Sequence, residues 1–319
     1  MNHNDDAYAT MLLTMALSPN REEYARPYST QEFVRLQEAV RAAGLRGPGK
    51  LLGVDISGLM AWLNLSEEEG YRAFTLLNRT VQLSYALEGY MREGIEVVTR
   101  YDDAYPDRLP RKLGEGAPAF FYRAGPASLL ERPAVAVLGI SGVRTSPEVR
   151  EAIERLAVLA AEKGFALITG GELGVSRVAA TAAAERDVPV VDILGGGMLA
   201  HLHEEVVGAR VAAGSAAAVS LEHPEAMFTV SHAIARNKLL FALADAAFVF
   251  NTDGKRGESD ALQSRTCDWI YAWEGYPGNG GIIARGATPF RALDAERLEV
   301  MSRSWRESQA QQMSLFDLM

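Results

Sequence analysis

Three clusters of glycine in this 319-residue sequence each follow a short apolar run and could hold an anion. They read Gly139-Ile140-Ser141-Gly142, Gly170-Gly171-Glu172-Leu173-Gly174 and Gly195-Gly196-Gly197. Glycine lets backbone N–H groups point outward at such a turn, and a helix that starts there adds positive potential, which suits a phosphate. A strand-to-helix turn also needs glycine for positive φ when no ligand binds. Because three such turns occur, we favour an anion-binding crevice with candidate contacts at Gly139, Gly142, Gly170, Gly171 and Gly174.

Basic side chains near these turns supply the matching charge. Arg144 follows the first glycine turn directly, and Lys255-Arg256 lie in a later loop. Arg236-Asn237-Lys238 lie in a stretch with helical periodicity, where Arg236 and Lys238 are predicted to reach outward. The predicted buried face of that helix consists of Ala235, Leu239, Ala242 and Leu243. By spacing alone, these basic residues fit a solvated surface better than a binding site.

Several enzyme and cofactor signatures are absent from the sequence. None of the glycine clusters is a G-x-G-x-x-G fingerprint, and there is no Walker A, G-x-S-x-G or H-E-x-x-H sequence. His201 and His203 lie beside two glutamates, but positions i and i+2 of a helix point about 200° apart, which disfavours a metal site. We therefore assign no catalytic residue, metal or cofactor, and we favour a binding protein over an enzyme. A mononucleotide, a nucleic-acid backbone and a metabolite phosphate remain open as ligands.

The elements that would position these residues indicate a Rossmann-like fold. Apolar runs alternate with helical runs from residue 134 onward, which is typical of a doubly wound parallel sheet covered on both faces. The predicted strands are 134–138, 165–168, 188–194, 216–221 and 246–250. We predict a smaller helical N-terminal domain over residues 1–98. The Rossmann-like domain then covers 99–293, beginning with an extended lead-in over 102–130, and a tether with a tail covers 294–319.

Net charge and composition restrict the partners. The sequence has a net charge of −9 and an isoelectric point near 5.2, so any nucleic-acid site must be a local patch. Cys267 is the only cysteine, which excludes an intrachain disulfide, and its apolar neighbours indicate a buried thiol. The N-terminus lacks the pattern of a secretory signal, and no apolar run reaches the roughly 18 residues of a membrane helix. We expect a cytoplasmic protein without a membrane partner.

Five segments, in order along the chain, resemble motifs of the DprA/Smf family of DNA-processing proteins. They are Asp102–Leu109 (DDAYPDRL), Val135–Ser146 (VAVLGISGVRTS), Thr169–Ser176 (TGGELGVS), Arg236–Lys238 (RNK) and Pro277–Ala287 (PGNGGIIARGA). They are similar to the family's D-x-x-YP-x-x-L lead-in, its strand with a G-S-R-x-x-S turn, its S-G-x-A-x-G-I-D turn, its R-N-R helix and its closing G-A segment. The resemblance covers residues 50–290.

This resemblance implies single-stranded DNA binding at the edge of the sheet and loading of the recombinase RecA. Carried over to this sequence, it makes Arg144, Arg236 and Lys238 the phosphate contacts, with Asn237 beside them. It also implies that Phe228 stacks on a base, a contact that contributes about 1–3 kcal/mol. Proteins of the family are often dimers, so a homodimer is left open.

Three features depart from the family pattern. Ser176 replaces the acidic residue of the G-I-D turn, and Lys238 replaces an arginine, which loses bidentate phosphate geometry. The glycine-rich loop after the fifth strand reads Gly257-Glu258-Ser259-Asp260, and its two carboxylates are predicted to repel a DNA backbone. The departures indicate a divergent member with an altered ligand or without RecA loading.

The chain ends in QMSLFDLM, and the segment from Gln312 to Phe316 is similar to the bacterial sliding-clamp-binding pentapeptide, Q-L-S/D-L-F. Met313, Leu315 and Phe316 would enter an apolar groove of the clamp, while the Gln312 side chain supplies an orienting hydrogen bond. The alternative is a terminal segment that folds back onto the protein's own core. We favour clamp binding, because the peptide is terminal, follows a polar tether and accompanies a DNA-linked resemblance.

Three functions are consistent with the sequence. The first is a DprA-like single-stranded DNA-binding protein in DNA processing and recombination, recruited to the sliding clamp by its tail. The second is a nucleotide or phosphorylated-metabolite sensor on the same fold, for which the acidic loop argues, with a role in defence against foreign DNA left open. The third is a nucleoside-monophosphate hydrolase similar to the lysine-decarboxylase-like proteins. We rank it last, because their P-G-G-x-G-T-x-x-E motif is absent.

Overall fold

The computed structural model describes residues 3–18, 23–254 and 257–293, together with Glu299, Arg303 and Glu307. The chain divides into two compact units, and each is described by itself. Unit 1 contains Met1–Ala127 and Leu194–Leu239, and unit 2 contains Ser128–Ile193 and Leu240–Met319. The domain boundaries after residues 98 and 293 stay predictions. Within the described ranges, no helix is long and apolar enough to cross a membrane.

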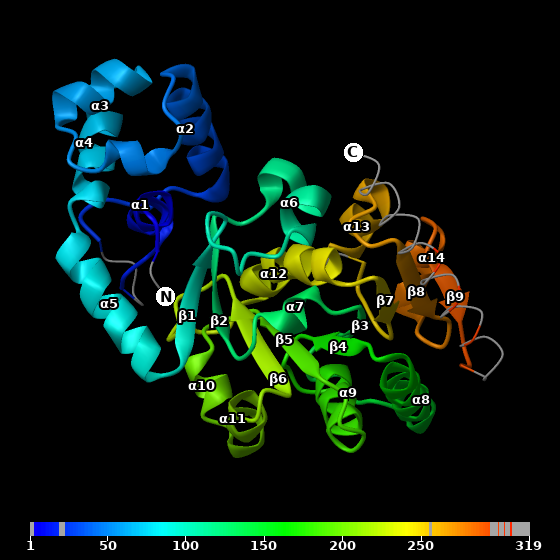
Figure 1. Cartoon of the computed structure of the whole chain (residues 1–319). Coiled ribbons are helices and arrows are strands. Elements are labelled where there is room, and N and C mark those ends of the chain that lie inside the picture. The colour runs from blue at the N-terminus through cyan, green and yellow to red at the C-terminus, as the bar shows by residue number, and fades with distance from the viewer. Residues whose placement is uncertain are drawn as a thin grey trace. The chain divides into compact units, whose positions relative to one another are not determined.

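Unit 1 begins with helices whose starts are fixed by polar caps (Figure 1). The elements are α1 (Asp5–Thr14), α2 (Thr30–Ala42), η1 (Pro48–Leu51), α3 (Ile56–Leu63), α4 (Glu67–Leu77) and α5 (Thr80–Arg92). Ser29 and Ser66 form capping boxes with Glu32 and Glu69, and Asp55 caps α3. These polar caps determine where α2, α3 and α4 begin.

Three strands and further helices complete unit 1. Strand β1 (Ile95–Thr99) pairs antiparallel with β2 (Phe120–Ala124), and β2 pairs antiparallel with β6 (Ala216–Ser220). The helices that follow are α10 (Leu199–Leu202), α11 (Glu205–Ala212) and the greater part of α12 (Val230–Leu243). One face of these strands, including Val97 and Tyr122, packs with Met11 of α1 and Leu83 of α5 in a buried cluster.

The extended lead-in predicted for residues 102–130 is wrong. This stretch contains α6 (Arg108–Leu113), η2 (Gly114–Gly116), strand β2 and the first part of α7 (Ser128–Glu131). The prolines concealed the pattern, because Pro110 lies in the first turn of α6, where a helix has no partner for the N–H that proline lacks.

Unit 2 is built on six parallel strands in the order β5-β4-β3-β7-β8-β9. They are β3 (Ala134–Leu138), β4 (Ala166–Thr169), β5 (Val190–Leu194), β7 (Ala246–Val249), β8 (Trp269–Trp273) and β9 (Thr288–Phe290). The direction of winding reverses between β3 and β7, as in dinucleotide-binding sheets. The predicted Rossmann-like doubly wound parallel sheet is confirmed, and β8 and β9 are strands that the sequence analysis missed.

Helices cover the sheet of unit 2 and complete its core. In Figure 1, α8 (Pro147–Lys163) and α9 (Val175–Ala184) lie side by side against it. The remaining elements are α13 (Glu258–Ser264), η3 (Pro277–Asn279) and α14 (Gly280–Ile283). Ile153 and Leu156 of α8 belong to the same buried cluster as Phe248 and Tyr271, whose stacked ring centroids are 4.8 Å apart. Cys267 is buried, as predicted.

Candidate functional site

The first glycine turn of unit 2 leaves β3 at the carboxyl edge of the sheet. Gly139 permits close packing, because a Cβ there would lie 2.8 Å from the Val175 side chain and 3.1 Å from Asn251 Oδ1. The buried Asn251 accepts a hydrogen bond from the Ile140 N–H. Gly142 has a φ of 76°, and a Cβ there would meet nothing within 4 Å. Asn251 therefore holds the turn, and Gly142 lies on its open side.

The second glycine turn, after β4, is held by hydrogen bonds of its own. The Gly170 N–H donates to Ser176 Oγ at 3.3 Å, and the Gly171 N–H donates to Thr169 Oγ1 at 3.0 Å. The Thr169 hydroxyl donates in turn to the buried Asp192 carboxylate. The amide hydrogens of Gly170 and Gly171 are thus engaged inside the protein, so a bound anion would depend on other groups. Ser176 stabilises the turn as a neutral acceptor.

Gly174 brings the two turns together. Its φ is 89°, and a Cβ there would lie 3.0 Å from the Val143 carbonyl oxygen, so both backbone conformation and space require glycine. Helix α9 starts directly after it, without a side-chain cap among the described residues. Helix α8 is capped by Ser146, whose hydroxyl accepts from the Val149 N–H at 3.3 Å, and Pro147 occupies its first position. Two helix starts therefore meet at this edge.

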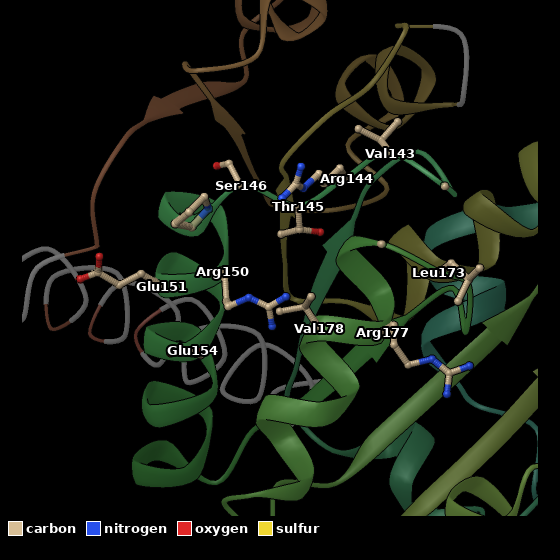
Figure 2. A pocket seen from close by; sticks show the side chains of 13 residues that line it. Val143, Arg144, Thr145, Ser146, Arg150, Glu151, Glu154, Leu173, Arg177 and Val178 are labelled. Carbon is tan, nitrogen blue, oxygen red and sulfur yellow. The ribbon is translucent and has the colours of Figure 1, made fainter.

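A pocket of about 1030 Å³ lies between the N-terminal turns of α8 and α9 (Figure 2). Arg144, Arg150 and Arg177 line it, and all three are exposed, so we call it the arginine pocket. Figure 2 shows Arg150 extending from α8 in the direction of Val178 on α9. The other lining residues are Gly142, Val143, Thr145, Ser146, Pro147, Glu151, Glu154, Leu173, Gly174 and Val178.

The charge balance of the arginine pocket is positive. Three arginines share it with two carboxylates, Glu151 and Glu154. Glu151 is also paired at 3.0 Å with Arg155, which does not line the pocket. The N-terminal turns of two helices add positive potential to that of the arginines. This arrangement suits phosphate groups, which arginine binds in bidentate fashion.

Arg150 and Arg177 were not predicted, although the sequence contains a signal for both. Arg150 is the fourth residue of α8, and Arg177 is the third residue of α9. The helix macrodipole disfavours cations in the first turn of a helix. Two arginines at such positions therefore indicate that these helix starts serve an anion. Arg144 and Gly142 were predicted and do line the pocket.

The third glycine cluster, at residues 195–197, lies in unit 1 and packs against the loop between β6 and α12 and against the start of α12. A Cβ at Gly195 would lie 2.9 Å from Ala233 Cα and 3.0 Å from the Phe228 ring, and a Cβ at Gly197 would lie 2.2 Å from the Pro224 carbonyl oxygen. Close approach of backbones explains these glycines without a ligand. Phe228 itself is 49% exposed, which leaves ring surface for stacking.

Helix α12 buries Leu239, Ala242 and Leu243, as predicted, but its buried face also includes a residue that was predicted to reach outward. Arg236 and Asn237 are each only 6% exposed, whereas Ala235 is exposed. Arg236 Nε donates to the Ala233 carbonyl oxygen at 3.2 Å. The predicted outward orientation of Arg236 is therefore wrong. The sequence of α12 has apolar residues on all sides of the helix, so it does not show clearly which side is buried. Lys238 is exposed, as predicted.

The first turn of α13 is less acidic at its surface than its sequence indicates. Glu258 is 2% exposed and accepts a hydrogen bond from Thr252 Oγ1 at 2.6 Å, so its carboxylate is not at the surface, and repulsion of DNA by this segment stays a prediction. Asp260 remains exposed. The basic pair Lys255-Arg256 and the predicted clamp-binding residues lie outside the described residues.

Comparisons with known proteins point to one family. The protein-family model for DNA recombination-mediator protein A matches residues 96–264, which is 169 of the 319 residues. DNA processing protein A (DprA) from Streptococcus pneumoniae is similar in structure, with a TM-score of 0.62 and 16% identity over 92% of this chain and 96% of that chain. DprA from Helicobacter pylori, described for its single-stranded DNA binding mode, has a TM-score of 0.51 and 19% identity over 67% of this chain and 96% of that chain. No curated protein sequence matches the chain.

The matched segment contains the features that the geometry singles out. It includes both glycine turns of unit 2, the arginine pocket and the Arg236–Lys238 segment. The two solved structures agree on the fold at low sequence identity. Because the family model matches more than half of the residues, the chain belongs to the DNA recombination-mediator protein A (DprA) family, which supports a role in DNA processing.

Proposed function

We propose that this chain binds single-stranded DNA and that the arginine pocket contacts the phosphates of the strand. The observation that carries the proposal is that Arg144, Arg150 and Arg177 line one pocket at two adjacent helix starts. Because the arginines come from a turn and from two different helices, they can contact successive phosphates of one strand. The binding mode for which the H. pylori protein is described supports the same ligand class.

Apolar groups beside the cations favour a single strand over a duplex. Leu173 is 64% exposed, and it lines the pocket together with Val143. The bases of a single strand are free to contact such a surface, whereas the bases of a duplex are stacked and paired. Lys238 and Phe228 of unit 1 remain proposed contacts for phosphate and base. The buried Arg236 and Asn237 are better suited to stabilise α12 than to reach the strand.

The test is fluorescence anisotropy of labelled oligo-dT, single and double stranded, across a salt series. We expect salt-sensitive binding that prefers the single strand and weakens at least tenfold in Arg144→Ala/Arg150→Ala. Arg155→Ala is the matched control, because Arg155 lies on α8 but does not line the pocket. The proposal fails if the double variant binds oligo-dT as tightly as the Arg155→Ala control.

Saturable binding of a phosphorylated nucleotide or metabolite, without binding of oligo-dT at low salt, would favour the sensor function instead. The carboxylates of Glu151 and Glu154 give that alternative its support, because they limit how closely a polyanion can approach one wall of the pocket. The same pocket variants would then lose the small ligand.

We also propose that the tail recruits the protein to the sliding clamp through Gln312, Met313, Leu315 and Phe316. Leu315→Ala/Phe316→Ala is expected to abolish association with purified clamp in surface plasmon resonance, while oligo-dT binding stays unchanged. Leu318→Ala is the control, because Leu318 is an apolar tail residue outside the pentapeptide. A drop in melting temperature in the double variant would support a tail that folds onto the core. Interaction with the recombinase, homodimerisation and a cytoplasmic location stay predictions.

A further inference from the structure

A second pocket, of about 740 Å³, lies wholly within unit 1. Its walls come from the segment leading into α2, from the start of β2 and from the loop between β6 and α12. We call it the tyrosine–histidine pocket, after Tyr28 and His232 in its lining. It contains none of the residues assigned to the DNA interface, so its chemistry needs an explanation of its own.

Two buried polar atoms of this pocket have no hydrogen-bond partner in the described part of the chain. They are the Tyr28 hydroxyl and His232 Nδ1. Tyr28 is only 8% exposed, and the Arg72 guanidinium lies 4.1 Å from the centroid of its ring, which holds the ring in place. Burying a polar group without a partner is destabilising, so such groups are usually paired. Two of them in one pocket point to a ligand that supplies the missing partners.

The histidine is set to accept a hydrogen bond from that ligand. His232 Nε2 lies 3.5 Å from Glu222 Oε2. The carboxylate favours the proton on Nε2, which leaves Nδ1 of the neutral ring as an acceptor. Glu222 lines the same pocket, and an ionised carboxylate is also an acceptor. The ligand must therefore carry N–H donors.

The remaining walls favour a flat, uncharged ring over a phosphate. Phe120 and Tyr122 line the pocket, with ring centroids 5.5 Å apart in an edge-on arrangement. Glu23 adds a second carboxylate, and burial lowers the pKa of His223, which keeps that imidazole neutral at pH 7. Arg26 also lines the pocket, but it is paired with Glu32, and Glu23 is paired with Arg79. A lining with two carboxylates and one arginine that is already paired disfavours a phosphate, whereas aromatic walls with acceptors fit a heterocycle with amino groups.

We propose that the tyrosine–histidine pocket binds a nucleobase that carries an exocyclic amino group, supplied as a free nucleoside or as one base of a DNA strand. The Tyr28 hydroxyl and His232 Nδ1 hydrogen-bond to this base, since neither atom has a partner among the described residues. Only the binding of a base from a DNA strand rests on the proposed function.

The test is calorimetric titration of the full chain with deoxyguanosine, deoxyadenosine, deoxycytidine and thymidine. At least one amino-bearing nucleoside is expected to bind about tenfold more tightly than thymidine, a difference of the size that one hydrogen bond gives. Tyr28→Phe and His232→Phe should each weaken that binding about tenfold. Tyr8→Phe is the control, because the Tyr8 hydroxyl donates to the Thr80 carbonyl oxygen outside the pocket.

The proposal is overturned if no nucleoside saturates the protein at millimolar concentration, or if Tyr28→Phe binds as well as wild type while retaining its melting temperature. An oligo-dT with one central copy of the base preferred in the titration distinguishes the two sources. If the pocket takes a base from a strand, that base tightens binding and Tyr28→Phe removes the gain. If it takes a free nucleoside, that base has no effect. Nucleoside binding by Arg144→Ala/Arg150→Ala tests the pocket independently of the DNA interface.

Discussion

The arginine pocket and the tyrosine–histidine pocket offer different side chains to a ligand. The arginine pocket places three exposed cations at two helix starts and has no aromatic wall among its lining residues. The tyrosine–histidine pocket has aromatic walls, two carboxylates, one arginine, and two buried polar atoms without partners in the described part of the chain. The first arrangement suits phosphates, because a cation attracts the charge of a phosphate from any direction. The second suits a base, which is recognised by the placement of single donors and acceptors.

This difference determines how each pocket depends on its surroundings. Exposed arginines bind a strand largely by Coulomb attraction and counterion release, so salt weakens the interaction. Hydrogen bonds made by buried groups depend instead on the exact position of a few atoms, which the packing of the unit must hold. Each of the following experiments should affect one pocket and spare the other.

Removal of all three arginines should have the largest effect. Arg144→Ala/Arg150→Ala/Arg177→Ala is expected to weaken oligo-dT binding about 100-fold, at roughly one factor of five per contact. The slope of log affinity against log salt should become shallower by about 2, since each single-strand phosphate contact contributes about 0.7. Anisotropy titrations measure both quantities. Nucleoside binding should not change, and a parallel loss there would contradict the separation of the two pockets.

Substitution of Gly174 should damage the arginine pocket without removing a charge. Gly174→Ala places a Cβ 3.0 Å from the Val143 carbonyl oxygen at a φ of 89°, so we expect a loss of about 2–3 kcal/mol in the free energy of unfolding. Gly142→Ala also has positive φ but meets open space, and should cost about 1 kcal/mol. Urea unfolding measures both. Equal losses in the two variants would show that the contact between the turns is unimportant.

Acid should reduce the stability that Glu32 and Arg72 give to the wall of the tyrosine–histidine pocket. Burial raises the pKa of Glu32, but hydrogen bonds from Arg72 and Arg26 outweigh this and hold that pKa well below its usual value of 4.5. Because the folded-state pKa is lowered, the stabilisation is complete above pH 4.5 and declines as the pH falls below it. Arg72, which Glu32 binds at 3.0 Å, covers the Tyr28 ring.

Glu32→Gln tests this pH dependence. At pH 7 the variant should be about 1 kcal/mol less stable than wild type, the usual size for a partly exposed ion pair. At pH 3 the difference should be smaller, because part of the Glu32 population in the unfolded state is then protonated. Urea unfolding at the two pH values provides the measurement, and a difference that grows in acid would contradict the assignment.

The smallest expected effect is a gain in the stability of the free protein. Tyr28→Phe removes a buried hydroxyl that has no partner among the described residues, so the free protein should gain up to about 1 kcal/mol of stability while it loses nucleoside affinity. Thermal unfolding without ligand measures the gain. A clear loss of stability would mean that the hydroxyl already has a partner inside the folded protein.

The parallel sheet could be predicted because its strands are nearly continuous apolar runs. The run Ala134–Leu138 is buried at every position, so composition alone identifies it. The segment over 102–130 could not be assigned in this way, because proline at a helix start is read as a break. Helix α12 was placed, but Ala235 and Arg236 exchanged their expected roles, since the small alanine tolerates exposure and the arginine finds a backbone acceptor.

The candidate sites could likewise be predicted only where their residues lie close together in the sequence. Gly142 and Arg144 lie next to each other in sequence, so their motif revealed one wall of the arginine pocket. Tyr28 and His232 are separated by about 200 residues, and only the folded chain of unit 1 shows that they line one pocket. The unpaired state of their polar atoms is a property of tertiary packing and leaves no pattern in the sequence.

Amide hydrogen exchange of the full chain, with and without oligo-dT, tests the central claim most directly. We predict protection by the oligonucleotide in the segments 142–150 and 173–178, which form the mouth of the arginine pocket. The last turns of α8, up to Lys163, should exchange as in the free protein. Tight binding of oligo-dT that leaves 142–150 and 173–178 unprotected would contradict the assignment of the DNA interface to this pocket.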